Sequence, residues 1–271
     1  MTGTVRLLTF NTLFRGSARA RLRALGEVLE RSEYDIVCLQ EVTSARNLAA
    51  LRRVARSYHQ VGYAPAFPIV RGGLVTLSRL PLTGQEFTLF RPARPVRREW
   101  LMLKGVLVTR HRVGDLPLTV VNTHLSANRD DDWSAANRYT RVEAAELRQL
   151  GGVVRAAELT GPAGPLVVAG DFNVPRDCAT YRDFVRATGL RDLLAGHREP
   201  TYRPTARWPD PPAIDQVLLS VPPAQAVRSR AAVVLREAVR LADGREEYLS
   251  DHFGIGVELR FGPADGAAEP G

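Results

Sequence analysis

Short apolar runs rich in β-branched residues recur along the chain between clusters of turn-forming residues. Such runs predict β-strands, because β-branched side chains pack well on a pleated sheet and turn residues end each strand. The predicted strands are Val5 to Phe10, Asp35 to Leu39, Leu74 to Ser78, Leu101 to Thr109, Leu118 to Thr123, Leu166 to Ala169, Ile214 to Leu219 and Phe253 to Phe261.

Longer stretches between these runs have apolar residues at three- and four-residue spacing, which predicts amphipathic helices. The predicted helices are Ala18 to Arg31, Ser44 to Tyr58, Trp133 to Leu159 and Ala179 to Thr188. Some strand pairs are joined by a helix and others by a short turn. This mixture favours a four-layer α/β sandwich, with two mixed β-sheets packed face to face and helices outside, over a barrel or a doubly wound parallel sheet.

Length and composition predict one folded domain. The chain has 271 residues, of which 45% are hydrophobic and 24% charged, so it can bury a sizeable core. We expect a single domain over residues 1–261. The tail over residues 262–271, GPADGAAEPG, has nothing to bury and is expected to be disordered.

No segment approaches the roughly 18 apolar residues of a membrane span, and the N-terminus lacks the pattern of a secretory signal. We therefore expect a cytoplasmic protein, or a secreted one if a leader was removed. Two cysteines, Cys38 and Cys178, do not indicate a disulfide framework.

The formal net charge of +8, from 37 basic against 29 acidic residues, would favour an anionic partner such as nucleic acid or a phospholipid surface. Every basic residue except Lys104 is arginine, however, so the excess can equally reflect a coding bias. Charge alone leaves the partner open.

Polar side chains interrupt the chain where six of the predicted strands begin or end. A carboxylate, amide or imidazole there lies at the rim of a sheet, where a ligand can reach it. Each alone could start a turn or cap a helix. Together they supply oxygen donors and two imidazoles, which suit a hard cation and proton transfer. The residues are Asn11, Glu41, His124, Asp171, Asn173, Asp215, Asp251 and His252.

The ordered motifs FN, QE, NTHL, GDFN, ID and SDH, spread from Val5 to Phe261, resemble those of the endonuclease/exonuclease/phosphatase (DNase I-like) superfamily. The histidine in NTHL separates the chain from apurinic endonucleases. The run from NTHL into a long helix, then GDFNVP and LSDHF, most resembles the neutral sphingomyelinase branch. The resemblance implies a DNase I-like fold and a metal-dependent hydrolase of phosphate esters.

The resemblance also implies a metal site. Glu41 would be the principal Mg²⁺ ligand, with Asn11 and Asp251 completing or adjusting the site. A sparse ligand set is expected, because Mg²⁺ usually keeps waters and substrate phosphate oxygens in its coordination shell. Mn²⁺ is expected to substitute.

By the same resemblance, His252 would be the general base on the attacking water, oriented by Asp215. Asp171 and Asn173 would position that water. His124 and the metal would stabilise charge that develops on the phosphoryl oxygens and the leaving group.

Other polar residues carry weaker signals. Lys104, in EWLMLKGVLV, matches a Lys-Gly that borders the active site in the sphingomyelinase-like branch, so it either faces the substrate phosphate or is a surface lysine. The basic loop Arg91 to Trp100 could contact lipid headgroups or nucleic-acid phosphates, or only solvent. Asp130, Asp131 and Asp132 favour an exposed turn over a second metal site, because consecutive side chains diverge.

His59, His111 and His197 match no motif and are interpreted as structural or surface residues.

Four functions remain open from the sequence. The leading hypothesis is a Mg²⁺-dependent phosphodiesterase acting on a sphingomyelin-like or other phospholipid. A DNase I-like endonuclease uses the same chemistry over a basic groove. A small-molecule or inositol phosphatase is the third, and a non-catalytic module that binds phospholipid or nucleic acid is the fourth. The substrate, the choice between diester and monoester, the number of metals and the oligomeric state stay undetermined.

Overall fold

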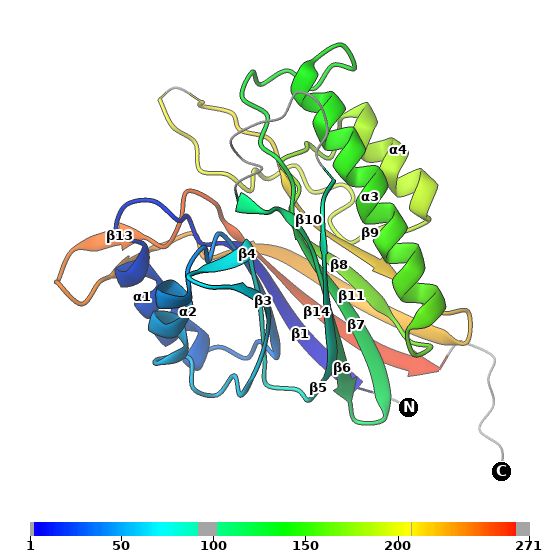
Figure 1. Cartoon of the computed structure of the whole chain (residues 1–271), viewed down its shortest axis with the longest axis horizontal. Helices are drawn as coiled ribbons and strands as arrows, with labels where there is room; N and C mark the ends of the chain where they lie inside the picture. The colour runs from blue at the N-terminus through cyan, green and yellow to red at the C-terminus, as the bar shows by residue number, and fades with distance from the viewer. Residues whose placement is uncertain (1–2, 92–101, 207, 264–271) are drawn as a thin grey trace.

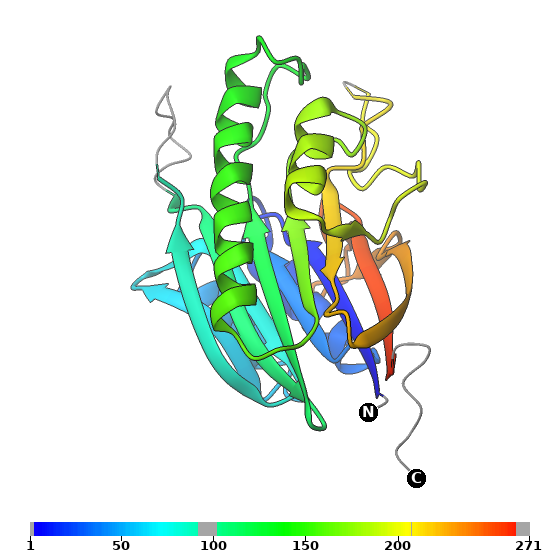
Figure 2. The ribbon, with the colours of Figure 1, turned by 90° about the vertical axis from the view of Figure 1, so that its right-hand side faces the viewer.

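Two six-stranded β-sheets lie face to face, and helices cover their outer faces (Figures 1 and 2). The computed structural model describes residues 3–91, 102–206 and 208–263. The first sheet runs in the order β11 (Gln225–Val234), β14 (Gly254–Pro263), β1 (Gly3–Asn11), β2 (Ile36–Gln40), β4 (Ile69–Ser78) and β3 (Gln60–Ala66). The second runs in the order β5 (Leu82–Leu89), β6 (Gly105–Val113), β7 (Leu116–His124), β8 (Leu166–Asp171), β10 (Asp215–Ser220) and β9 (Arg191–Asp192).

Both sheets are mixed. Strand β1 pairs parallel to β2 and antiparallel to β14, while β7 pairs parallel to β8 and antiparallel to β6. A separate ribbon is formed by β12 (Ala238–Arg240) and β13 (Glu246–Tyr248). Helices α1 (Ala18–Glu30) and α2 (Ala45–Arg52) pack on the first sheet, and α3 (Arg138–Thr160) and α4 (Ala179–Thr188) pack on the second. The predicted four-layer α/β sandwich is confirmed.

Three apolar layers hold the sandwich together, and alternation along single strands supplies them. Leu7 on β1 packs between the two sheets, whereas its neighbour Leu8 packs under α1 and α2. Val120 and Val121 on β7 divide in the same way between the inter-sheet layer and the layer under α3 and α4. Because both faces of these strands are buried, the sequence shows continuous apolar runs.

A buried polar contact joins the two sheets beneath the strand ends. Gln40 at the end of β2 donates to the side chain of Asn122 on β7 at 2.8 Å, and Asn122 donates back to the carbonyl oxygens of Leu39 and Val75 at 3.2 and 3.1 Å. Unpaired buried amides are costly, so these bonds favour one register of the two sheets. Gln40 directly precedes Glu41 in the chain, and Asn122 lies two residues before His124.

Element boundaries differ from the prediction in two helices. The segment Ser44 to Tyr58 is helical only over Ala45–Arg52, and the residues after Arg52 form turns. The apolar spacing typical of a helix extends beyond Arg52 because Ala55 and Tyr58, which lie in these turns, are also buried. Helix α3 begins at Arg138, later than Trp133, where Asn137 caps it by accepting a hydrogen bond from the Tyr139 amide at 2.7 Å.

Strands at or near the sheet edges were missed. Strands β3, β5, β9, β11, β12 and β13 were not predicted, and the predicted strand from Leu101 begins at Gly105. Strand β5 is an edge strand with no buried residue, so no apolar run marks it. The loop Arg91 to Trp100 beyond Arg91, together with Leu101 and the tail beyond Pro263, lies outside the described residues.

Among the described residues, no helix has the length and apolar character needed to cross a membrane.

Candidate active site

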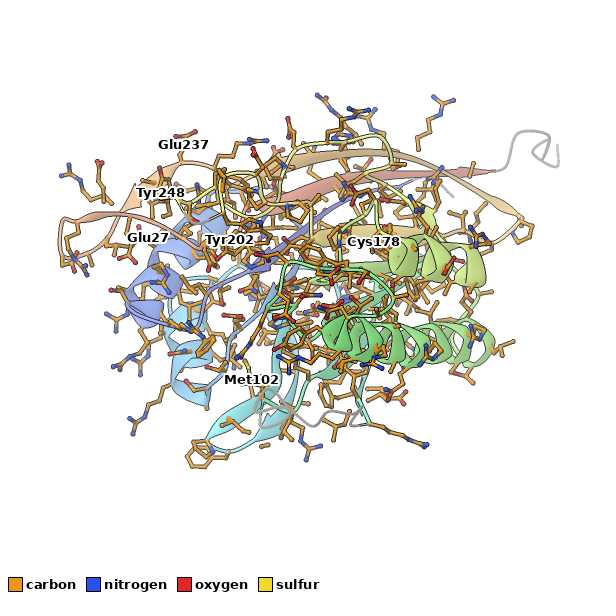
Figure 3. The ribbon with its side chains drawn as sticks, turned by 90° about the horizontal axis from the view of Figure 1, so that it is seen from above. Glu27, Met102, Cys178, Tyr202, Glu237 and Tyr248 are labelled. Atoms are coloured by element: carbon orange, nitrogen blue, oxygen red, sulfur yellow. The ribbon has the colours of Figure 1, made fainter. Side chains whose placement is uncertain are left out.

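The polar strand ends converge at one edge of the two sheets. Parallel pairing brings His124 level with Asp171, and antiparallel pairing brings Asp215 level with the same residue. A pocket of about 490 Å³ opens there, and Met102 and Tyr202 line it from two different loops (Figure 3). Of the predicted site residues, the pocket is lined by Glu41, Lys104, His124, Asp171, Asn173, Asp251 and His252. Asn11 and Asp215, each 1% exposed, lie behind this lining.

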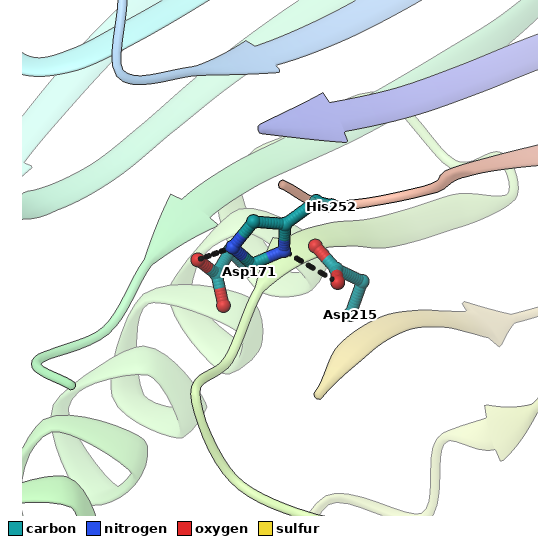
Figure 4. A group of neighbouring side chains, drawn as sticks. All are labelled: Asp171, Asp215 and His252. Atoms are coloured by element: carbon teal, nitrogen blue, oxygen red, sulfur yellow. Dashed lines mark hydrogen bonds and ion pairs between the residues drawn. The ribbon is translucent and has the colours of Figure 1, made fainter. Parts of the chain in front are cut away.

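His252 lies between two aspartates (Figure 4). Its Nδ1 atom is 2.9 Å from Oδ2 of Asp215, and its Nε2 atom is 3.7 Å from Oδ2 of Asp171. Asp215 is buried and His252 is nearly so. With Nδ1 held by Asp215, the other ring nitrogen is the one that faces the pocket.

A single threonine in the loop before β10 positions both members of this pair. The Thr201 hydroxyl accepts the backbone N–H groups of Ile214 and Asp215 at 2.9 and 3.0 Å. The Thr201 carbonyl oxygen accepts the N–H of Phe253, the residue after His252, at 2.7 Å. This loop therefore fixes the spacing between β10 and the segment that carries His252.

The charges around His252 perturb its proton affinity. Burial alone would lower the pKa of His252, but the nearby carboxylates, Asp215 foremost, outweigh burial and raise that pKa to about 10. Burial raises the pKa of Asp171 to about 7, against the opposing effect of His252. The carboxylates therefore increase the affinity of the His252 imidazole for a proton.

Asp171 is a hub of hydrogen bonds. Its Oδ2 atom accepts from the side-chain amide of Asn11 at 2.9 Å and lies 3.3 Å from Nε2 of His124. Its Oδ1 atom accepts the backbone N–H of Asn173 at 2.9 Å. Close packing under it requires glycine at position 170, where a Cβ atom would overlap the Thr123 carbonyl oxygen. Asn11 therefore holds Asp171 from behind the pocket, and its own Oδ1 atom accepts the N–H of Leu13 at 3.0 Å.

Lys104 is a buried cation in the pocket. Its Nζ atom donates to the carbonyl oxygen of Leu125 at 2.6 Å and lies 3.0 Å from Nε2 of His124. Burial lowers the pKa of His124 well below its usual value, and the positive charges of Lys104 and His252 lower it further by smaller amounts. His124 is therefore neutral, and Lys104 carries the positive charge at this wall.

Glu41 is held in an unusual backbone conformation. Its φ of 64° lies in the left-handed region, and Gly73, with φ 63°, packs against it so closely that a Cβ atom at position 73 would lie 3.0 Å from Cα of Glu41. The Glu41 carboxylate accepts the N–H of Phe14 at 2.8 Å. These constraints aim the side chain into the pocket.

Asp251 lines the pocket beside its neighbour His252. Its Oδ2 atom accepts the hydroxyl hydrogen of Tyr202 at 3.0 Å, and its Oδ1 atom accepts from Ser250 at 3.2 Å. Tyr202 also packs edge-on against the His252 ring, with centroids 5.0 Å apart. Sequence reasoning missed Tyr202 and Thr201, which lie in the proline-rich loop from His197 to Pro212.

The donor set fits a hard divalent cation such as Mg²⁺. Glu41, Asp171 and Asp251 all line the pocket with carboxylates, the ligand type that Mg²⁺ prefers. Asp171, Asp215 and His252 form a tighter group, with ligand atoms within 4.8 Å of one another. An ion inside that group would break the hydrogen bond that His252 donates to Asp215, so Glu41 and Asp251 suit a cation better.

The remaining polar candidates lie away from the pocket. Asp132 accepts hydrogen bonds from the N–H and hydroxyl of Ser134 at 2.8 and 3.0 Å, in the exposed turn that was predicted. His59 and His197 are exposed, and His111 is buried on β6. None of these residues lines the pocket.

Comparisons with known proteins agree with the fold. The profile of the Endonuclease/Exonuclease/phosphatase family matches residues 8–252. The chain belongs to this family, whose named activities all hydrolyse phosphate esters. The match contains every strand end described above.

Individual proteins resemble the chain in sequence or in structure. Inositol phosphosphingolipids phospholipase C of Schizosaccharomyces pombe is 31% identical over 57% of this chain, but the match spans only 36% of that protein. Sphingomyelinase C of Streptomyces griseocarneus has a similar structure, with a TM-score of 0.70 at 22% identity, covering 94% of this chain and 99% of that one.

A beta toxin variant of Staphylococcus aureus, crystallised with bound magnesium ions, has a TM-score of 0.73 at 16% identity over 93% of this chain and 98% of that one. These structural likenesses show the fold.

Proposed function

We propose that the chain is a Mg²⁺-dependent phosphodiesterase of the sphingomyelinase-like kind. The observation that carries the proposal is the His252 ring, held by Asp215 at one nitrogen and facing a pocket with the other. The same pocket holds carboxylates for a cation and the ammonium group of Lys104 for a phosphate.

In this reaction, water attacks phosphorus and the bond to the leaving alcohol breaks. His252 accepts the proton of the attacking water at Nε2, and Asp215 stabilises the imidazolium that forms through the bond at Nδ1. Asp171, held by Asn11 and the Asn173 amide, positions the water beside Nε2. Such a base contributes about 10²–10⁴-fold in rate.

The metal would be held by Glu41 and Asp251. When bound, it supplies positive charge that offsets the carboxylates around His252 and polarises the phosphoryl oxygens. Mn²⁺ would substitute, because it also prefers oxygen ligands. The magnesium ions in the beta toxin variant support this choice of ion.

Lys104 would bind a phosphoryl oxygen of the substrate. Because His124 is neutral, its Nε2 atom accepts a hydrogen bond from the Lys104 ammonium and orients that group, while the lysine provides the charge.

A sphingolipid-type phosphodiester is the proposed substrate class. The support is the motif layout together with the S. pombe relative, whose name describes a phospholipase C for phosphosphingolipids. A DNase I-like nuclease would use the same residues, so a substrate panel must separate the two.

The test is metal-dependent hydrolysis of bis(p-nitrophenyl) phosphate by the whole chain, with Mg²⁺, with Mn²⁺ and with a chelator. We expect turnover with either ion, none with chelator, and near-complete loss in His252→Ala. No turnover with either ion would contradict the proposal and favour a binding module. Nicking of supercoiled plasmid by the wild type but not by His252→Ala, with sphingomyelin vesicles left intact, would favour the nuclease.

A further inference from the structure

A stretch of the chain beside the pocket carries positive charge without any acidic residue. Between Val42 and Gln85 there are six arginines and no aspartate or glutamate. A coding bias toward arginine replaces lysines but does not remove acids, so it does not explain this segregation. Five of the six are exposed: Arg46, Arg52, Arg53, Arg56 and Arg71.

The same stretch presents apolar side chains to solvent at the tip of the β3–β4 hairpin. Phe67 is 90% exposed, and Ile69 is 37% exposed. Along β4, Ile69 and Arg71 are exposed while Val70 between them is 2% exposed, so Ile69 and Arg71 share one face. Arg46, Phe67, Ile69 and Arg71 are called the hairpin surface below.

The hairpin surface is attached to the segment that follows Glu41. The Ala45 N–H donates to the Pro68 carbonyl oxygen at 3.0 Å, and the N–H of Val70 donates to Thr43 at 3.1 Å. The pocket wall nearest to Glu41 has the same composition, because Phe14 is 38% exposed and Arg15 lies over its ring at 5.3 Å. The hairpin tip and this wall of the pocket therefore both combine exposed apolar side chains with arginines.

We propose that the hairpin surface docks the protein on an anionic lipid bilayer. Phe67 and Ile69 enter the boundary between headgroups and acyl chains, and Arg46 and Arg71 contact the anionic headgroups. No ion pair of Arg46 or Arg71 occurs within residues 3–91, 102–206 and 208–263, so both guanidinium groups can meet lipid phosphates.

A nucleic acid would satisfy the arginines equally well. A nucleic acid would leave Ile69 without an apolar partner. A bilayer accommodates the apolar side chains of the hairpin surface as well as its two arginines. Docking would bring a membrane-bound phosphate ester to the pocket, and this role rests on the proposed function. Docking itself needs no turnover and can be measured without it.

The experiment is co-sedimentation of the whole chain, in chelator, with phosphatidylcholine vesicles that contain or lack phosphatidylserine. We expect binding that requires phosphatidylserine and weakens with salt. Phe67→Ser should weaken binding roughly tenfold or more, since it removes the large apolar group that enters the bilayer. The matched control is Leu159→Ser, which removes an 85% exposed apolar side chain from α3 and should bind as the wild type does.

A second pair of variants tests the charges. Arg46→Gln combined with Arg71→Gln should weaken binding about 25-fold at low salt, from roughly fivefold per arginine near the surface. Arg182→Gln combined with Arg198→Gln makes the same change in net charge at other exposed sites and should have a smaller effect. All variants should hydrolyse bis(p-nitrophenyl) phosphate at the wild-type rate, which shows that they are folded.

Three results would overturn docking: no vesicle binding by the wild type, equal binding by Phe67→Ser and Leu159→Ser, or Phe67-dependent binding to DNA with none to vesicles. Soluble-ester turnover alongside any of these would leave the proposed hydrolase intact. Absence of soluble-ester turnover in the wild type, alongside normal vesicle binding, would contradict the proposed hydrolase and leave docking intact.

Discussion

The hydroxyl of Tyr202 donates a hydrogen bond to Asp251 at 3.0 Å while the Tyr202 ring packs edge-on against His252. One side chain thus contacts both the proposed metal ligand and the proposed base. Tyr202 is 13 residues away from Asp215 along the chain and 49 from Asp251, so only the fold brings these groups together.

Tyr202→Phe removes the hydrogen bond and keeps the ring. Because outer hydrogen bonds that orient metal ligands typically contribute 10–100-fold to metal affinity, we predict that half-maximal activity requires about tenfold more Mg²⁺. Turnover at saturating Mg²⁺ should fall by only a few-fold. The measurement is activity against Mg²⁺ concentration, with Tyr248→Phe as the control, since Tyr248 is half-exposed and lies outside the pocket lining. Equal midpoints for both variants would contradict a positioning role.

Lys104→Met removes the ammonium group and keeps the length of the side chain. Loss of one charged donor to a phosphoryl oxygen should lower kcat/KM for bis(p-nitrophenyl) phosphate by about 10²–10³-fold. The fold should survive, because a thioether suits a buried site. A kcat/KM within threefold of the wild type, in a variant with normal circular dichroism, would show that Lys104 does not face the phosphate.

Gly73→Ala tests the close packing behind Glu41. The new Cβ atom would lie 3.0 Å from Cα of Glu41 in a backbone with φ 63°. We predict a loss of about 1–3 kcal/mol in the free energy of unfolding, from strain and steric contact, and a further loss of activity as Glu41 shifts. Gly114→Ala is a matched control with φ 60° and no neighbour within 4 Å, so it carries the backbone strain alone. Equal destabilisation and equal activity in the two variants would show that close packing at Gly73 does not hold Glu41 in place.

His111 should make the protein sensitive to mild acid. Its Nε2 atom lies 2.9 Å from the Thr109 hydroxyl, and its Nδ1 atom has no hydrogen-bond partner in the described part of the chain. Burial lowers the pKa of His111 to about 4. The unfolded chain binds the proton first, so stability is fully present above about pH 6.5 and falls toward pH 4.

His111→Gln should therefore flatten the decline in unfolding free energy between pH 7 and pH 4, by up to about 3 kcal/mol relative to the wild type. Urea unfolding across this range measures the effect. His197→Gln, which removes an exposed imidazole, should leave the decline as in the wild type. A wild-type slope in His111→Gln would show that His111 does not titrate on unfolding.

The sequence predicted the inner strands well and the edges poorly, for a physical reason. Strands β1, β7 and β8 are buried on both faces and appear as continuous apolar runs. Strand β11, at the edge of its sheet, has Val227 as its one buried residue, and Arg228, Ser229 and Arg230 after it are all exposed, so its pattern resembles a loop. Burial on one face only leaves too few apolar positions to mark a strand.

The placement of the site could be predicted where it depends on strand ends, because paired strands end at a common edge. Asp171 and His124 follow from parallel pairing alone. Thr201 and Tyr202 could not be predicted, since hydrogen bonds to residues far along the chain set the path of their loop. The charge of the pocket wall could not be predicted from the sequence either, because His124 is neutral as a result of its burial beside Lys104.

The most direct test of the coupling between Asp215 and His252 is a double-mutant cycle on kcat for bis(p-nitrophenyl) phosphate with saturating Mg²⁺. Asp215→Asn and His252→Ala should each lower kcat by about 10²–10⁴-fold, and the double variant should be no slower than His252→Ala alone, because the aspartate acts only through the histidine. Losses that multiply in the double variant would show that the two residues act independently and would contradict the mechanism.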